Sequence, residues 1–379
     1  MRVAVFPHFS GPMFLLCLLL PYAAVVAACA FVFMRRALMS VRDVCGASPV
    51  RPFTVVVCTS DADVHTCARN IGVIASSLGS SGSLIVVADH VSTSGLALLR
   101  HTAEAGRCAV RVVENAQRRG KKFAQREGVL AARTESVVCM DADCVVGDGF
   151  AVAVGAAIDG FGGKPFMLLL PVEMRGDGSF LGRLVEMEFG CLQVVTAGSA
   201  LLGRPSMANG AGMAFCRGMF LAHDPRSRYA SGDDMFLLAH AIHSGASVRY
   251  LLDGRAAVST VAPAGVEAYL RQRTRWLAKA GGYRDWGVIL LALVVFAAVV
   301  AWPLALALAC AGFVSWAGFA AVFLAKLAID ALACAAWVVF RLGWRGLLRL
   351  WVAVPLEALY PAMVAVVSFR ALLADRSRW

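Results

Sequence analysis

Charged side chains are scarce in this sequence. Only 16% of its 379 residues are Asp, Glu, Lys or Arg, whereas 59% are apolar. A soluble domain carries about 25% charged and roughly 45–50% apolar residues, so the composition argues against a purely soluble protein. The excess of apolar side chains predicts segments that lie in lipid.

Several patterns that would indicate other classes of protein are also missing. The twelve cysteines show no paired metal-ligand spacing, so we interpret them as reduced, small hydrophobic side chains. The chain has no internal repeat and no low-complexity linker. Its basic residues leave a net charge of +11 but form no stripe with aromatic residues, so we expect no nucleic-acid partner. Loops that face anionic lipid account for this charge.

A long apolar run near the N-terminus predicts a transmembrane helix within residues 1–41. The run from Gly11 to Met34 has no charged residue and exceeds the roughly 20 residues that cross a bilayer core. A cleaved signal peptide is the alternative, but the apolar residues continue beyond Cys29. The positive-inside rule places the next domain in the cytosol, because the flanking arginines are unequal: Arg35, Arg36 and Arg42 follow, and Arg2 precedes.

The region 287–379 contains about three further apolar segments, at 287–313, 314–340 and 350–369. If all three cross the membrane, the basic C-terminus lies outside, which conflicts with the charge rule. Pro355 and Pro361 leave open a last segment that is re-entrant or interfacial. Lys326 and Asp330 interrupt the middle segment one helical turn apart, where they can pair with each other or serve a transporter.

Between residues 42 and 286, short apolar runs alternate with polar stretches of helical length. Apolar runs occur at 53–58, 83–88, 108–113 and 136–140, and helix-like stretches at 61–78 and 118–133. This alternation is typical of buried parallel strands joined by crossover helices. We predict an α/β domain with a mostly parallel sheet, whose ligands bind beyond the carboxyl ends of the strands. The stretch 180–202 predicts a helix at the membrane surface.

Carboxylates stand where ligands would bind. Asp141 and Asp143 follow the run 136–140, and two oxygen ligands at this spacing suit Mg²⁺ or Mn²⁺ bound to a donor diphosphate. An ordinary strand-end turn is the alternative. Asp89 follows the run 83–88 and could contact a nucleoside, and Lys121 could reach a phosphate or base.

Two later elements carry acidic and basic groups. Asp233 and Asp234 open a predicted helix at 235–242, where they either favour the helix N-terminus or supply a general base, with Asp234 the first candidate. The stretch 272–276 reads Gln-Arg-Thr-Arg-Trp, directly before the segment at 287. Its arginines can bind diphosphate and its Trp a sugar ring, although a juxtamembrane anchor has the same composition.

Taken together, these elements resemble family-2 glycosyltransferases of the membrane-integrated type, the group of cellulose, chitin and hyaluronan synthases, and most closely its short bacterial members. The family pattern is an Asp, Asp-x-Asp, an acidic pair ending in Asp, and Gln-x-x-Arg-Trp. The pattern is found here, in order, over residues 53 to 286: Asp89, Asp141 and Asp143, Asp233 and Asp234, and Gln272, Arg275 and Trp276.

The resemblance implies a GT-A fold and inverting transfer from a nucleotide sugar, UDP- or GDP-linked, in a bacterial inner membrane. It implies donor binding by Asp89, Lys121, Asp141, Gln272 and Arg275, with Asp141 and Asp143 on the metal and Asp234 or Asp233 as base. Trp276 and Gly210, in a glycine-rich loop, would bind the acceptor. The first strand departs from the family pattern, because Thr59 to Asp63 replace an Asn-Glu-like pair.

Three functions remain open from the sequence. The first is an enzyme that adds one or a few sugars to a lipid, lipid-linked or glycan acceptor. The second is a processive polysaccharide synthase, which the small number of apolar segments disfavours. The third is a non-catalytic membrane scaffold, which the retention of every acidic element disfavours.

Overall fold

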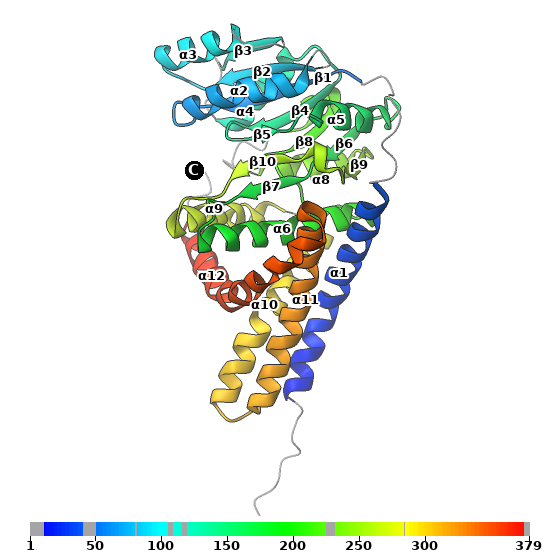
Figure 1. Cartoon of the computed structure of the whole chain (residues 1–379), viewed down its shortest axis with the longest axis vertical. Helices are drawn as coiled ribbons and strands as arrows, with labels where there is room; N and C mark the ends of the chain where they lie inside the picture. Colours follow the sequence, from blue (N-terminus) through cyan, green and yellow to red (C-terminus); the bar gives the residue numbers. More distant parts are fainter. Residues whose placement is uncertain are drawn as a thin grey trace, which may run out of the picture.

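The computed structural model describes residues 11–40, 51–79, 82–104, 109–115, 120–224, 232–283 and 285–374. In this part of the chain, an α/β domain stands on a group of long apolar helices (Figure 1). The domain boundary predicted after residue 41 lies outside the described residues, as do Arg376, Arg378 and the start of the strand predicted at 108–113.

The domain is built on a seven-stranded sheet with the order β3-β2-β1-β4-β8-β6-β9. Parallel pairing joins β3 to β2, β2 to β1, β1 to β4 and β6 to β9, whereas β8 runs antiparallel to both of its neighbours. The strands predicted from apolar runs are therefore confirmed, and so is the mostly parallel sheet. The strand bounds are β1 (Phe53–Thr59), β2 (Gly82–Ala88), β3 (Val110–Glu114), β4 (Ser136–Asp141), β6 (Phe166–Leu169), β8 (Met213–Cys216) and β9 (Ser247–Tyr250).

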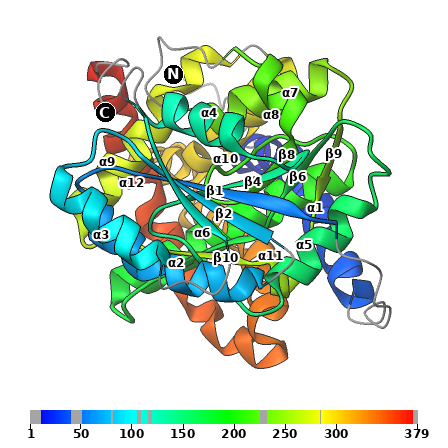
Figure 2. The same ribbon diagram turned by 90° about the horizontal axis from the view of Figure 1, so that it is seen from above.

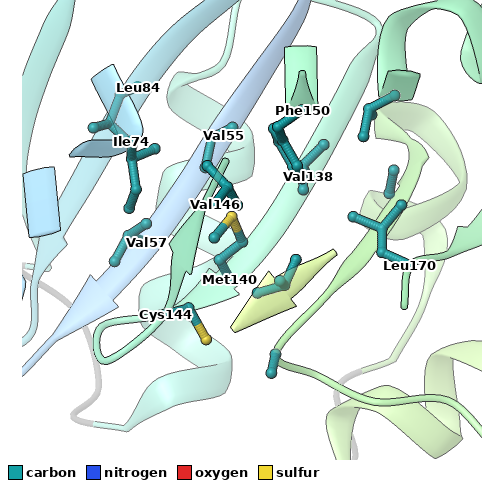
Figure 3. Close-up of a cluster of buried hydrophobic side chains, with 14 of the residues drawn as sticks. Val55, Val57, Ile74, Leu84, Val138, Met140, Cys144, Val146, Phe150 and Leu170 are labelled. Atoms are coloured by element: carbon teal, nitrogen blue, oxygen red, sulfur yellow. The ribbon is translucent and has the colours of Figure 1, made fainter. Parts of the chain in front are cut away.

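Helices cover both faces of this sheet (Figure 2). Successive side chains of a strand point to opposite faces, so Val55 and Val57 pack in one core and Val56 in the other. Figure 3 shows the first core, where Ile74 and Phe150 meet the strand side chains. The first face carries α2 (Val64–Leu78), α3 (Thr93–Glu104) and α5 (Phe150–Asp159), and the second carries α4 (Lys121–Ala131), α7 (Arg217–Ala222) and α8 (Asp233–His243).

A three-stranded sheet, β5-β10-β7, lies between the large sheet and the apolar helices (Figure 1). Its strands are β5 (Val145–Val146), β10 (Val258–Val261) and β7 (Val172–Arg175), with a short 3-10 turn, η1 (Gly254–Ala256), before β10. The Ser259 hydroxyl of β10 donates a 2.5 Å hydrogen bond to Glu173 of β7. Glu173 also pairs with Arg341, near the end of a long apolar helix, so the small sheet is fastened to that helix.

Three long helices run side by side away from the sheets: α1 (Gly11–Ser40), α10 (Trp286–Cys310) and α11 (Trp316–Leu342) (Figure 1). Leu15 and Leu19 of α1 form one buried cluster with small side chains of α10 and with Val322 of α11. These helices, α6 (Phe180–Leu201) and the stretch Trp344–Leu373 are long and apolar enough to cross a membrane.

The helix α6 is confirmed over the predicted range, but protein surrounds it. In its most apolar stretch 72% of the residues are buried, against 22% in α10. Gly198 and Gly190 allow neighbouring helices to approach closely. A Cβ at Gly198 would lie 2.4 Å from Cβ of Cys29 in α1, and one at Gly190 would lie 2.1 Å from Trp337 of α11.

The last helix, α12 (Ala353–Leu373), follows a 3-10 segment, η3 (Trp344–Val352), and lies beside α9 (Val266–Ala278) (Figure 1). Arg370 of α12 pairs with Glu267 of α9 at 2.9 Å, at the level of the domain. A second short 3-10 turn, η2 (Ala280–Gly282), connects α9 toward α10.

Lys326 and Asp330 of α11 and Glu357 of α12 form one group between the apolar helices. Lys326 Nζ lies 2.5 Å from Asp330 Oδ2, as the helical spacing predicts, and 3.2 Å from Glu357 Oε2 of α12. The Tyr22 hydroxyl of α1 donates to Asp330 at 2.6 Å. The group therefore ties α1, α11 and α12 together.

Candidate active site

The carboxyl ends of three parallel strands gather the first acidic residues. The register pairs Thr59 of β1 with Ala88 of β2, and Cys58 with Asp141 of β4, so all three strands end at one edge. Asp89 directly follows β2. Asp141 is the last residue of β4, and Asp143 lies two positions beyond it. The predicted gathering of these acids beyond the strand ends is therefore present.

Both carboxylate oxygens of Asp89 accept hydrogen bonds from the protein. Its side chain is 11% exposed, and Oδ1 accepts a 2.8 Å hydrogen bond from the Asn115 amide. Oδ2 accepts from the backbone N–H of Gly120 at 2.9 Å, just before α4. Asp89 thus positions the start of α4, and its predicted contact with a nucleoside stays a prediction.

Lys121, the first residue of α4, stands between two acids. Its Nζ lies 2.5 Å from Asp141 Oδ1 and 3.9 Å from Asp233 Oδ2. Burial alone would lower the pKa of Lys121, but the two carboxylates outweigh it and raise that pKa well above its usual range. The ammonium group therefore stays charged and holds Asp141 near Asp233.

Asp143 is held from the small sheet. The hydroxyl of Thr260, in β10, donates a 2.6 Å hydrogen bond to Asp143 Oδ2. Burial raises the pKa of the Asp143 carboxyl, and the Thr260 hydrogen bond offsets part of the rise. Thr260 has no local signature in the sequence, because its partner lies 117 residues away.

Asp234 lies in the first turn of α8 and accepts three N–H donors. Oδ1 accepts from the Met235 backbone at 2.8 Å and from Lys279 Nζ at 3.1 Å. Oδ2 accepts from the Gly210 backbone at 3.3 Å. The glycine-rich loop and the predicted base are thus in contact, and a Cβ at Gly210 would lie 3.6 Å from Lys121 Nζ.

Asp233 begins α8 and faces the same lysines. Burial pushes the pKa of its carboxyl up, but Lys121 and then Lys279 pull it further down, so the net pKa is lowered. Its Oδ2 is buried and has no hydrogen-bond partner among the described residues. Asp233 is therefore a buried anion that stands next to the predicted base.

Lys279 shows which face of α9 is turned to this site. It directly follows the last helical residue, keeps helical backbone angles, and contacts Asp234. Arg275 is four positions before Lys279 and shares its helix face. Gln272 and Trp276 instead contact Arg273, whose guanidinium donates a 2.6 Å hydrogen bond to Gln272 Oε1 and lies over the Trp276 ring. Arg275 is exposed, and Trp276 is half-buried.

Arg273 is buried between α9 and α6. Its guanidinium forms a bidentate pair with Glu188 of α6, with a closest distance of 2.6 Å, and the two side chains are 8% and 7% exposed. The same guanidinium lies 4.2 Å from the centre of the Trp276 ring, which also packs near Phe189. This arginine is therefore a buried structural group that sets the angle between α9 and α6.

Lys121, Asp141, Asp233, Asp234 and Gly210 thus lie together, and the structure adds three residues that the sequence analysis did not single out. These are Lys279, Thr260 and Glu188. Lys279 could have been found by extending the helical period of 272–276 by one turn, whereas no local pattern marks the other two. The roles assigned to Gln272, Arg275, Trp276 and Gly210 stay predictions.

The carboxylates of this site suit a divalent cation only if the substrate supplies further oxygen ligands. Asp141 and Asp143 supply carboxylate oxygens, and no group of three metal-ligating side chains occurs in the described part of the chain. Mg²⁺ and Mn²⁺ are commonly held by one or two carboxylates together with water and substrate phosphate. The residues present therefore fit such a metal when a phosphorylated donor accompanies it.

Comparison with known proteins shows the family of the chain and its class of fold. The family model described as "Glycosyltransferase like family 2" matches residues 49–278. A mannosyltransferase from Pyrobaculum calidifontis, solved in complex with GDP-Man and Mn2+, has a similar structure, with a TM-score of 0.51 at 18% identity. The match covers 96% of this chain and 98% of that one. None of the curated proteins matches the sequence. The predicted GT-A class of fold is confirmed.

The Glu188–Arg273 pair predicts a clear stability effect. Glu188→Gln leaves a buried guanidinium without its counter-charge, so we expect the free energy of unfolding to fall by about 3–5 kcal/mol. Thermal unfolding of detergent-solubilised protein measures this loss. Glu188→Gln combined with Arg273→Met should recover most of it.

The exposed Arg100–Glu114 pair supplies the control, since its side chains are 58% and 54% exposed. Glu114→Gln should change stability by only about 0–1 kcal/mol. Unchanged stability of Glu188→Gln, together with lost donor binding, would show that Arg273 serves the donor instead of the fold.

Proposed function

The chain belongs to glycosyltransferase-like family 2, and we propose that it is a membrane-embedded, inverting enzyme that transfers a sugar to a lipid or lipid-linked acceptor. The observation that carries the proposal is the meeting of Asp141, Asp233 and Asp234 around Lys121 and Lys279. On α9, Arg275 lies one helical turn before Lys279, on the same helix face. The donor is a nucleotide sugar, UDP- or GDP-linked, and GDP-Man in the similar structure supports testing a GDP-linked sugar first.

In the proposed reaction, the acceptor hydroxyl attacks the anomeric carbon as Asp234 removes its proton. A new C–O bond forms to the acceptor, and the bond between the anomeric carbon and the donor phosphate oxygen breaks. Its electron pair leaves with the nucleoside diphosphate. A divalent cation bound at Asp141 and Asp143 would neutralise charge on that leaving group. Arg275 is exposed on α9 and would bind the donor phosphate.

The layer of α6 and α9 lies between the strands of the domain and the long apolar helices (Figure 1). The site is therefore one helix layer from the apolar helices, which favours a lipid-linked acceptor. A processive polysaccharide synthase is the second candidate. Among the described helices, those that extend away from the domain are α1, α10 and α11, which favours transfer of one or a few sugars.

The helix arrangement supports a cytosolic catalytic domain. Arg35 and Arg36 lie near the domain end of α1, and the stretch 311–315 between α10 and α11 has no basic residue. Arg370 reaches Glu267, so an interfacial or re-entrant α12 keeps its end on the domain side. That arrangement removes the conflict that three spanning C-terminal segments would create. The proposed location is a bacterial inner membrane.

The test of catalysis begins with purified protein, a panel of UDP- and GDP-linked sugars, and nucleotide release as the readout. Asp234→Asn should reduce transfer by at least about 10²-fold and leave donor binding almost unchanged, because the base acts on the acceptor. Trp276→Ala should weaken acceptor use and spare donor hydrolysis by water. Near-normal transfer by Asp234→Asn would move the base to Asp233.

Metal dependence is a separate prediction. Excess chelator should abolish transfer, and Mg²⁺ or Mn²⁺ should restore it. Asp143→Asn should weaken metal-dependent donor binding in a titration with each cation, since it removes one of two carboxylate ligands. The exposed Asp148, five residues further on, provides the control, and Asp148→Asn should behave as wild type. Full activity in chelator would rule the metal out.

Membrane orientation can be tested by labelling cysteines in intact cells. In a background with the exposed Cys17 and Cys310 changed to Ser, a cysteine replacing Asp159 should resist an impermeant reagent. A cysteine replacing Phe313, at the far end of the helices and 78% exposed, should react. The reverse pattern would invert the proposed topology.

A further inference from the structure

We propose that Lys279 is a positioning residue, which holds the Asp234 carboxylate in register with the face of α9 that binds the substrates. This inference rests on the proposed function. The Lys279–Asp234 pair joins α9 to α8, with 3.1 Å between Nζ and Oδ1. The two side chains are only 12% and 15% exposed, so solvent screens their attraction much less than that of a surface pair.

The three hydrogen-bond donors to Asp234 connect its carboxylate to different elements of the fold. The backbone N–H groups of Met235 and Gly210 belong to α8 and to the loop before β8, so they fix the carboxylate within that part of the domain. Among the described donors, Lys279 alone ties the carboxylate to α9, one helical turn beyond Trp276. The position of the base relative to α9, and so to Arg275 one turn before Lys279, therefore depends on this ammonium group.

The local backbone is shaped around the Lys279 side chain. Gly232, which precedes α8, has a φ of +95°, in the region that favours glycine. A Cβ at Gly232 would lie 3.1 Å from Cδ of Lys279 and 3.1 Å from the Phe236 ring. The absence of a side chain at this position leaves room for the alkyl stem, so the entry to α8 accommodates Lys279 directly.

Among the described lysines, Lys279 is the one that donates a hydrogen bond to Asp234. Lys121 pairs with Asp141 and Asp233. The Lys122 ammonium lies 5.2 Å from the centre of the Phe236 ring. Loss of Lys279 would therefore leave the Asp234 carboxylate held by the backbone N–H groups of Met235 and Gly210, without its described hydrogen bond to α9.

The test compares Lys279→Met with Lys279→Arg in the full-length protein, using the nucleotide sugar that supports wild-type transfer. Misplacing a catalytic group by about 1 Å can cost about 10²-fold in rate, so Lys279→Met should lower kcat by about 10- to 100-fold. The donor KM should stay near the wild-type value, and Lys279→Arg should restore most of the lost kcat. Lys164→Met, at an exposed lysine outside the site, should change neither parameter.

A double-mutant cycle with Asp234→Asn shows whether Lys279 acts through Asp234. Lys279→Met should cost nothing further in the Asp234→Asn background, and this double variant also balances the pair's charge if Lys279→Met alone folds poorly. Additive losses, an unchanged kcat in Lys279→Met, or a raised donor KM with normal kcat would each overturn the proposal. The last result would make Lys279 a phosphate ligand. Absence of wild-type transfer from every nucleotide sugar would instead count against the proposed function.

Discussion

Alternation of charge holds the candidate active site together. Asp141, Asp233 and Asp234 approach one another at the ends of β4 and α8, where like charges would repel. Lys121 lies between Asp141 and Asp233, and Lys279 pairs with Asp234. Removing water from such a cluster strengthens both the attractions and the repulsions. The position of each acid therefore depends on the lysine beside it.

The helix α9 connects this charged cluster to the rest of the molecule. One face carries Lys279 toward Asp234, a second carries Arg273 to Glu188 of α6, and a third carries Glu267 to Arg370 of α12. A rigid helix turns a displacement on one face into a displacement on the others. The residues of α9 that are predicted to bind substrate are thus positioned by contacts that involve no substrate.

The small sheet makes a second connection between the apolar helices and the site. On β10, Ser259 bonds to Glu173, which pairs with Arg341 of α11, while the adjacent Thr260 bonds to Asp143. Neighbouring residues of a strand point to opposite faces, so one strand can serve both contacts. The helices that could span a membrane and the carboxylate predicted to bind metal are consequently joined through two adjacent residues.

The sequence by itself determined the elements whose signal is local. Continuous apolar runs of strand length identified β1, β2 and β4, since strands buried on both faces need such residues, and long uncharged runs identified α1 and α10. The acidic residues at the strand ends could be identified because they directly follow these apolar runs.

Tertiary structure alone decided which distant groups contact these acidic residues. Thr260 reaches Asp143 across 117 positions, and Lys279 reaches Asp234 across 45, because folding brings their elements together. The place of α12 was likewise undecided by its composition, and the structure joins it to α9 through Arg370 and Glu267 and to α11 through Glu357 and Lys326.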